Sequence, residues 1–433
     1  MKNLYTRLFA FFVVFNIFYV FAEDAQFNVN VTAAKHEKLK IKLIVVGKLS
    51  KKINPIIEVI KNDLAFSGQF DVIIAKDYCK KIDTKNDITA FFSADCRLGV
   101  FFTEEKRKKT IGCRLYDLEY AQMLKGFECN PEGKNVRAWA HTISDTIWPV
   151  LTNEQGFFST KIAYCKKINR KHKKSYKHIY VADYDGSNEE LLVSTPTVNI
   201  TPRWNNDPAN PLVFYSEHTN ENVRLMVADM NRRRKIVSNF DGLNILSTFS
   251  PDGKKFAYCA SRADGHCQIY FYDGELKRLT NQGNNISPTF ADEGKTLYFC
   301  SDHLTGNPQI YKYDLESGQK ERISSGGFAV STSFCPKKEL LAYSKMIKGL
   351  MQIFVYNPKT GIHEQLTFNH GNKDECSWSP CGNYLLFSVE HGVKSQLAVL
   401  NLLTRNISFI TPKSADCYYP CWSPMYAQFP AIT

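Results

Sequence analysis

The chain has 433 residues, a formal net charge of +12 and 44% hydrophobic residues. This length favours two folded domains over one, and the hydrophobic content excludes a chain too polar to form globular cores. The 30 Phe and 22 Tyr residues, together with 23 Gly and 17 Pro, favour many short strands joined by tight turns.

The first 22 residues have the composition of a cleavable signal peptide. Lys2 and Arg7 carry positive charge, residues 8–21 form an apolar run, and a cleavage site precedes Glu23. An uncleaved membrane anchor is the alternative, but the run is shorter than the roughly 20 apolar residues that span a bilayer. We therefore predict export of a protein that is peripheral to membranes and does not span them, with a flexible segment at 23–38.

Basic residues gather in two segments, Lys161–Lys177 and Arg232–Lys235. A nucleic-acid patch has this composition. Export, and the position of both segments at hairpin turns of the repeat described below, favour solvated basic loops with affinity for anionic envelope surfaces. We predict no nucleic-acid partner.

All thirteen cysteines follow the predicted signal peptide. An oxidising compartment permits disulfides, and the odd count leaves at least one thiol without a partner in the chain. A zinc site from Cys376, Cys381, Cys417 and Cys421 is the alternative, but no C-x-x-C pair or paired histidines accompany them. We predict no metal and no cofactor.

An internal repeat is the strongest signal in the sequence. An aromatic residue recurs every 41 to 45 residues or so, which is about the period of a four-stranded propeller blade. After each aromatic anchor come a turn similar to Pro-Asp-Gly, a second strand, a polar loop, a third strand and a brief fourth strand. The anchors are Trp204, Phe249, Phe290, Phe334, Trp378 and Trp422.

The second and third strands are apolar enough to bury both sheet faces between neighbouring blades. Cys259 and Cys300 occupy the position that Ser216, Ser344 and Ser388 hold in other units, so a small buried side chain explains them without a redox role.

The last anchor, Trp422, has no complete unit after it. The missing strands match residues 161–165, 178–181 and 190–193 at the other end of the repeat. We predict that the two ends complete one blade together, which removes exposed sheet edges. The expected fold is a six-bladed β-propeller over residues 156–433, closed by the C-terminal strand.

Residues 39–155 have a different pattern, which predicts a small α/β domain. Apolar residues at helical spacing predict helices, and a charged turn separates two paired strands. Pro149 is expected just after the second helix. The expected strands are 39–46, 70–74, 97–103 and 110–118, and the expected helices are 55–66 and 136–148.

Several segments together resemble the TolB family. They are Asn62–Phe70, Arg114–Asp117, Arg137–Asp145 and the repeated Ser-Pro-Asp-Gly, Gln-Ile-Tyr and Arg-Leu-Thr motifs. The resemblance implies a periplasmic adaptor of the Tol-Pal system that acts in outer-membrane integrity and in constriction during cell division. It implies that the propeller binds the peptidoglycan-associated lipoprotein Pal and that the mature N-terminus contacts TolA, with other envelope proteins as further partners. That TolA segment comprises Glu23, Asp24, Ala25, Gln26 and Phe27.

Loops that join one blade to the next crowd one mouth of a propeller channel and suit a protein partner. We expect these loops at 198–202, 243–247, 284–288, 328–332, 372–375 and 415–419. In the family, Pal contacts fall on such loops, which implies Leu243, Asn244, Leu246, Asn285, Ile286 and Ser287.

Alternatives remain at these loops. Leu246 and Ile286 could instead pack only into their own blades. Asp374, Glu375 and Asp416 are interpreted as ordinary turn residues, with a mild acidic rim as the alternative.

Catalytic motifs are absent from the sequence, which contains no G-x-S-x-G, no phosphate loop, no G-x-G-x-x-G and no H-E-x-x-H. His141 lies between Trp139 and Ile143 in a predicted helix, which favours structural packing. We predict a protein that is not an enzyme. The alternative is a propeller hydrolase or lactonase with a metal site in the channel, because such sites can be assembled from scattered residues.

Overall fold

A computed structural model describes residues 38–50, 54–77, 79–105, 110–130, 135–168, 176–207, 209–261, 265–368 and 370–426. The predicted signal peptide and the predicted TolA segment lie outside the described residues. Among the described helices, none has both the length and the apolar composition needed to cross a bilayer.

The N-terminal region contains a five-stranded sheet with the order β2-β1-β3-β4-β5. Strand β1 pairs in parallel with β2 and β3, whereas β3, β4 and β5 pair in antiparallel fashion. The elements are β1 (Leu39–Val45), α2 (Asn54–Phe66), β2 (Phe70–Ile74), α3 (Lys85–Thr89), β3 (Leu98–Glu105), β4 (Thr110–Asp117), β5 (Gln122–Cys129) and α4 (Val136–Thr152). The predicted α/β region is confirmed, although the sequence did not predict α3 or β5.

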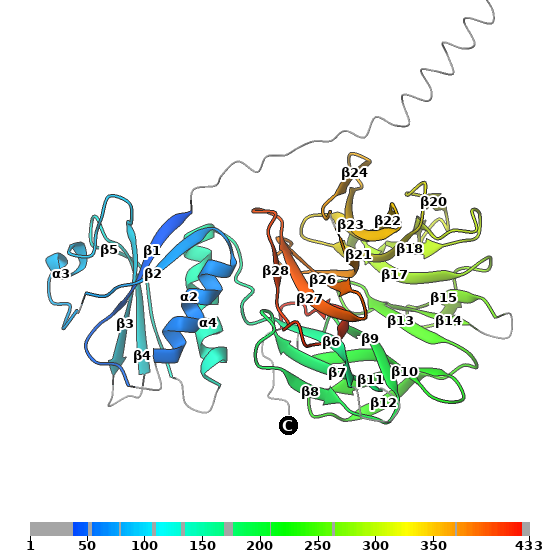
Figure 1. The fold of residues 1–433 in the computed structure, drawn as a ribbon, viewed down its shortest axis with the longest axis horizontal. Coiled ribbons are helices and arrows are strands. Elements are labelled where there is room, and N and C mark those ends of the chain that lie inside the picture. Colours follow the sequence, from blue (N-terminus) through cyan, green and yellow to red (C-terminus); the bar gives the residue numbers. More distant parts are fainter. Residues whose placement is uncertain are drawn as a thin grey trace, which may run out of the picture. The chain divides into compact units, whose positions relative to one another are not determined.

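Helices α2 and α4 lie side by side and pack on the sheet (Figure 1). Apolar residues at helical spacing form the buried face, with Ile60 of α2 and Ile143 and Ile147 of α4 fully buried. The predicted end of α4 is wrong, because Pro149 lies inside the helix. The helix continues to Thr152 because Asn153 adopts a left-handed conformation, and its N–H donates to the Pro149 carbonyl.

The rest of the described chain forms a β-propeller of antiparallel sheets, four of them four-stranded and one eight-stranded. The four-stranded sheets comprise β13 (Asn244–Phe249), β14 (Phe256–Ser261), β15 (Cys267–Tyr272) and β16 (Leu276–Arg278); β17 (Asn285–Ala291), β18 (Thr296–Ser301), β19 (Gln309–Asp314) and β20 (Lys320–Arg322); β21 (Ala329–Cys335), β22 (Leu340–Ile347), β23 (Leu350–Asn357) and β24 (Ile362–Gln365); and β25 (Asn372–Trp378), β26 (Tyr384–His391), β27 (Lys394–Asn401) and β28 (Ile407–Phe409).

The eight-stranded sheet combines two groups of four strands. One group is β9 (Val198–Trp204), β10 (Leu212–His218), β11 (Val223–Asp229) and β12 (Arg234–Ser238). The other is β29 (Cys417–Trp422), β6 (Lys161–Ile168), β7 (Tyr176–Asp183) and β8 (Glu190–Val193). A single parallel residue pair, Lys177 with Val198, joins the two groups.

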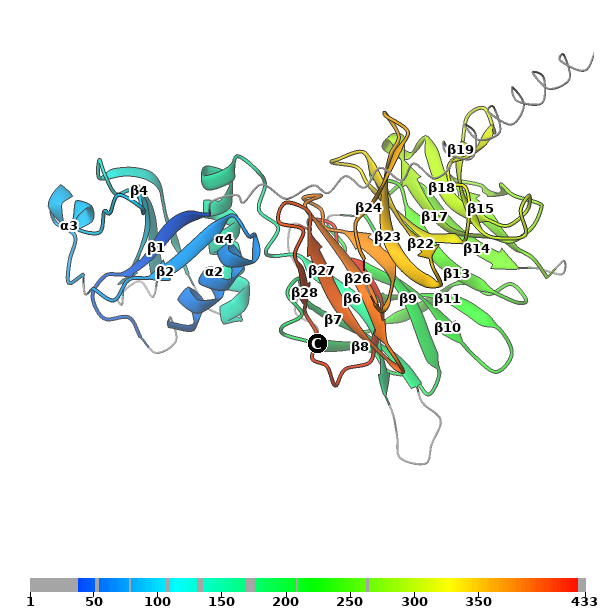
Figure 2. The ribbon, with the colours of Figure 1, turned by 45° about the horizontal axis from the view of Figure 1, so that its top comes forward.

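The last strand returns to the start of the propeller, as predicted. Strand β29 pairs with β6 in antiparallel fashion, with Tyr418 opposite Cys165 and Trp422 opposite Ile162. In Figures 1 and 2 the orange and red strands β26–β28 accordingly lie beside the green strands β6–β8. The propeller therefore joins its two ends within one sheet, and the inner edge of that sheet is supplied by β29.

The predicted small buried position in the second strand of each unit is also confirmed. Cys165, Cys259 and Cys300 are fully buried there, as are the equivalent Ser216 and Ser344. Side chains of this size fit where neighbouring sheets approach most closely.

Candidate binding site at the propeller channel

The first strand of each four-stranded group contains one β-bulge at an equivalent position. The bulged residue is not glycine, yet its φ is positive, and the strand register shifts beside it. A non-glycine residue in this left-handed conformation costs about 1–2 kcal/mol, so the surrounding packing must hold it there. The bulged residues are Thr201, Leu246, Ser287, Ser331, Glu375 and Tyr419.

These bulges correct the prediction of mouth loops. Most of each predicted loop belongs to the first strand of its sheet, because the bulge lets that strand continue past the polar and small residues that suggested a loop. Leu246 and Ser287 accordingly lie in β13 and β17. The predicted contact residues thus stand mainly on the channel wall, and a strand holds side chains more precisely than a loop.

Hydrogen bonds between neighbouring first strands fix this wall. The indole N–H of Trp378 donates to the Ser333 carbonyl at 3.0 Å. The backbone N–H of Trp422 donates to the Ser377 hydroxyl at 2.9 Å. The Thr332 hydroxyl also donates to the Ser287 carbonyl. These bonds tie β17 to β21, β21 to β25 and β25 to β29 across the boundaries between sheets.

Two predicted contact residues, Asn244 and Asn285, have structural bonds that account for their polarity. Asn244 is fully buried, and its amide donates to the carbonyls of Val223 and Phe240 at 2.8 and 2.7 Å. Asn285 is 2% exposed, and its amide donates to Gln268 Oε1 at 3.0 Å. Both side chains hold the start of their strands in place.

The other predicted contact residues remain accessible to different degrees. Leu243 is 38% exposed, whereas Leu246 and Ile286 are partly buried against the core cluster beneath them. Ser287 is also partly buried. The arrangement presents apolar side chains from two neighbouring sheets on one rigid wall, which is suited to a protein partner.

The interpretation of the acidic residues as turn residues is wrong. Asp374 and Glu375 lie in β25, and Asp416 is buried just before β29, where it accepts the Ser395 N–H at 3.1 Å. Glu375 is half-buried and accepts the N–H of the next bulged residue, Tyr419, at 2.7 Å. Burial, with a smaller effect from Asp374, raises the pKa of the Glu375 carboxyl well above its ordinary value.

The basic segments fall only partly in turns. Arg232 and Arg233 lie between β11 and β12, as predicted, but residues 161–168 form β6 and residues 169–175 lie outside the described residues. Lys177 in β7 packs over aromatic rings, with its Nζ 4.2 Å from the Tyr418 ring centroid.

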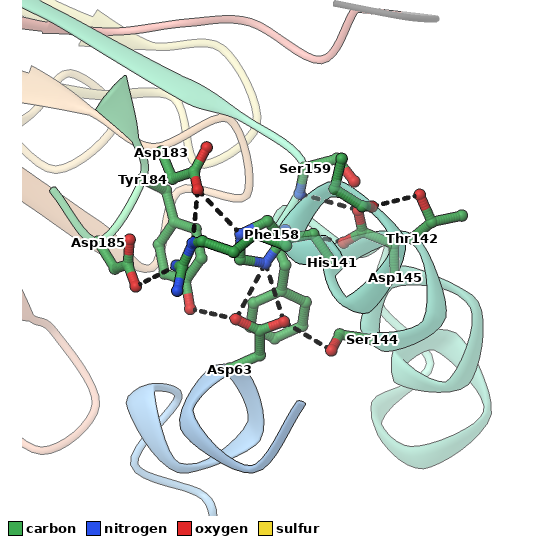
Figure 3. A network of polar contacts seen from close by, with 12 residues as sticks. Asp63, His141, Thr142, Ser144, Asp145, Phe158, Ser159, Asp183, Tyr184 and Asp185 are labelled. Atoms are coloured by element: carbon green, nitrogen blue, oxygen red, sulfur yellow. Dashed lines mark hydrogen bonds and ion pairs between the residues drawn. The ribbon is translucent and has the colours of Figure 1, made fainter. Parts of the chain in front are cut away.

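A buried charged network joins α2, α4 and the end of β7 (Figure 3). Asp63 of α2 accepts hydrogen bonds from His141 Nδ1 at 3.0 Å, from the Ser144 hydroxyl at 2.7 Å and from the Tyr184 hydroxyl at 2.9 Å. The other imidazole nitrogen of His141, Nε2, lies 3.4 Å from Asp183. Two helices of the α/β region and the first blade strands are thereby linked through one imidazole.

Further charges complete this network. Arg137 Nε donates to Asp183 at 2.8 Å and its Nη2 donates to Asp185 at 2.7 Å, while Lys161 also binds Asp183. Burial by itself lowers the pKa of His141, but the bonds to Asp183 and Asp63 raise it by more, to about 9. Burial by itself raises the pKa of Asp183. The hydrogen bonds and charges of His141 and Lys161 lower it by more, so the pKa lies well below its ordinary value.

A close backbone contact also lies at this junction. The Asn401 amide donates to the Ser67 carbonyl at 2.8 Å. Gly68 beside it has φ +74°, and an added Cβ would lie 2.7 Å from Thr404 Cγ2. Glycine is therefore favoured both by its backbone conformation and by the close approach of Thr404, which lies in the turn after β27.

Sequence reasoning missed this network, although it placed His141 in a structural role. A signal was present: Asp63 follows Ile60 by three positions and Ile56 by seven, so it lies on the buried face of α2. A carboxylate on an apolar helix face indicates a buried partner, but the partner came from α4 and β7 far along the chain.

All thirteen cysteines are free thiols, and all except Cys129 are buried. Burial raises the pKa of Cys300 and Cys417 to about 12 and that of Cys129 to about 11. Among the described residues, no group of three or more His, Cys, Asp or Glu side chains is arranged to hold a metal ion.

The fold and its channel define a β-propeller protein with an N-terminal α/β region. The family model described as the TolB beta propeller domain matches residues 148–426. The chain belongs to the TolB family.

Curated relatives agree with this assignment. The Tol-Pal system protein TolB of Gluconobacter oxydans (strain 621H) is 35% identical over 63% of this chain and 61% of its own length. That of Rickettsia prowazekii (strain Madrid E) is 30% identical over 46% of each chain. The chain thus spans between about half and three fifths of the length of these relatives. Crystalline TolB from Acinetobacter baumannii has the same fold, with a TM-score of 0.76 and 24% identity over 90% of this chain and 97% of that one.

Proposed function

We propose that this protein is a non-enzymatic adaptor of the Tol-Pal system that works in the periplasm, supporting outer-membrane integrity and constriction during cell division. The names of its curated relatives support a role in that system. The observation that carries the proposal is the channel wall at β13 and β17, where bulges and the buried bonds of Asn244 and Asn285 hold apolar side chains of neighbouring first strands.

The propeller of this proposal has six blades and spans residues 156–433, after a signal peptide at 1–22, a flexible segment at 23–38 and an α/β domain at 39–155. Two features favour six. The halves of the eight-stranded sheet share only one residue pair, so each counts as a blade. One bulged residue with positive φ also occurs in the first strand of each group, from Thr201 to Tyr419.

The proposed partner at the channel mouth is the lipoprotein Pal. Leu243, Leu246 and Ile286 offer the apolar contact area, and Ser287 follows Ile286 at the bulge of β17. Asn244 and Asn285 act by fixing those strands. A partner that buries this patch gains most from the few side chains at its centre.

TolA is the proposed second partner, through Glu23, Asp24, Ala25, Gln26 and Phe27. A tethered segment of this kind would link the Pal-bound propeller to a partner at another membrane.

A pull-down with Pal from the same cell tests the proposal. Wild type should be captured, and Leu246→Asp combined with Ile286→Asp should lose capture because two carboxylates would enter an apolar contact. Ile362→Asp is the matched control, since Ile362 is a 63% exposed isoleucine on the outermost strand β24. Normal capture of the folded double variant would refute this binding face.

A further inference from the structure

A separate cavity of about 450 Å³ lies in the channel on the far side of the bulges. Its lining begins at Ser247 in β13 and Thr289 in β17, so it excludes the six proposed Pal-contact residues. All six aromatic anchors contribute apolar surface to the wall, which also carries polar groups. They are Trp204, Phe249, Phe290, Phe334, Trp378 and Trp422.

The residue before each anchor also lines this cavity, and these equivalent positions supply its polar groups. They hold Arg203, Thr248, Thr289, Ser333, Ser377 and Cys421. The Thr289 hydroxyl accepts the Phe334 N–H at 3.3 Å, and the Ser377 hydroxyl accepts the Trp422 N–H at 2.9 Å. Because each oxygen is already an acceptor, its own proton is free to donate to a ligand.

Arg203 gives the cavity a positive charge. Its Nη1 donates to the neighbouring Pro202 carbonyl at 2.8 Å. Lys337 also lines the cavity, whereas no Asp or Glu does. Glu375 interacts electrostatically with Arg203 from a longer distance. Its carboxyl group already accepts the Tyr419 N–H, and burial raises the pKa of this group, which favours its neutral form.

An unsatisfied group points to a missing partner. Ser247 is 3% exposed and lines the cavity, yet its hydroxyl has no hydrogen-bond partner among the described residues. Leaving a buried hydroxyl unpaired costs about 1–3 kcal/mol. A ligand with acceptor atoms in this cavity would supply the missing partner.

We propose that this cavity binds a small organic anion, with a carboxylate or phosphate group on Arg203 and the surrounding hydroxyls, and with its apolar body against the aromatic anchors. The volume falls within the range of small-molecule sites, and a guanidinium with convergent hydroxyl donors matches an anionic acceptor. Because the Pal-contact residues lie beyond the bulges, this site is independent of the proposed function.

Tryptophan fluorescence of the full chain provides a local readout, since Trp204, Trp378 and Trp422 line the cavity. The probes are p-nitrobenzoate, p-nitrophenyl phosphate and the neutral p-nitrobenzyl alcohol, each of which quenches nearby indole emission. We expect saturable quenching by at least one anion in the micromolar to millimolar range, and the stronger of the two identifies the preferred group. The alcohol should quench without saturation.

Arg203→Gln should weaken anion binding at least about tenfold, because it removes the charged donor and leaves a shorter, neutral polar side chain. Arg405→Gln is the control, since Arg405 pairs with Glu364 on the surface. Unchanged thermal unfolding would show that both variants are folded. Equal binding of the alcohol, unaltered binding by Arg203→Gln, or no saturable binding of either anion would each overturn the proposal.

Discussion

At the scale of single residues, the charge on His141 has the largest predicted effect. This imidazole lies between Asp63 and Asp183, within a buried network that also contains Asp185, Arg137 and Lys161. Protonated His141 brings these charges close to balance, whereas its neutral form leaves buried carboxylates without enough positive charge. The network therefore stabilises the junction of α2, α4 and β7 only while His141 is protonated.

The first prediction concerns pH. The folded pKa of about 9 lies above the unfolded value near 6.5, so the stabilisation is fully present below pH 6.5 and is lost as pH rises through about 9. This shift corresponds to about 3 kcal/mol. In urea unfolding, the difference in free energy between wild type and His141→Gln should therefore shrink across that window. His391→Gln, at an exposed histidine, should show no such trend; a gap of constant size for His141→Gln would contradict the assignment.

The bulged residue Ser331 tests backbone strain at one position. Its φ is +60°, which glycine adopts freely and β-branched residues avoid. We expect Ser331→Gly to match or exceed wild type in free energy of unfolding and Ser331→Val to lose about 1–2 kcal/mol. Ser333, two residues later in the same strand, is the control, and there the order of glycine and valine should reverse. The same order at both sites would argue against strain at the bulge.

At the scale of elements, β29 closes the ring. A chain that ends at Asp416 lacks this strand and the buried Trp422, so β6 keeps an open edge. We expect it to lose at least about 3 kcal/mol in chemical unfolding and to unfold without a single sharp transition. A chain that ends at Tyr426 retains β29 and should unfold like the full protein. Cooperative unfolding of the shorter chain at the wild-type midpoint would contradict ring closure.

Most elements could be predicted because their signals are local or recur along the chain. The aromatic anchors recur at a fixed period, and the pairing of β29 with β6 follows from strands that are missing at one end and present at the other. The bulges could not be predicted, since Leu246 and Glu375 are poor candidates for positive φ and adopt it only because packing holds them. The extension of α4 past Pro149 depends in the same way on its cap, Asn153.

The candidate sites were less predictable than the fold, because they combine residues from distant segments. Leu246 and Ile286 could be chosen from the repeat, but the buried bonds of Asn285 require Gln268 in another strand. The cavity beyond the bulges needs one residue from every first strand, including Arg203, and no local motif marks it. Sequence periodicity predicts which positions are equivalent, while only the assembled ring shows what they face.

At the scale of the whole molecule, two features bear on the proposed adaptor role. The channel wall offers a rigid apolar patch on neighbouring first strands, and the charged network fastens the α/β region to the start of the propeller. A partner bound at the wall would therefore contact a propeller whose two ends are already joined through the pairing of β29 with β6. Rigid presentation of this kind reduces the entropy that binding must overcome.

Hydrogen–deuterium exchange of the protein with and without Pal tests this central claim most directly. Bound Pal should slow amide exchange in residues 243–247 and 285–288, which carry the proposed contact residues, and should leave the outermost strands β16 and β24 unchanged. Protection confined to those outermost strands, or a complex that leaves both channel segments exchanging at their free rates, would contradict the account.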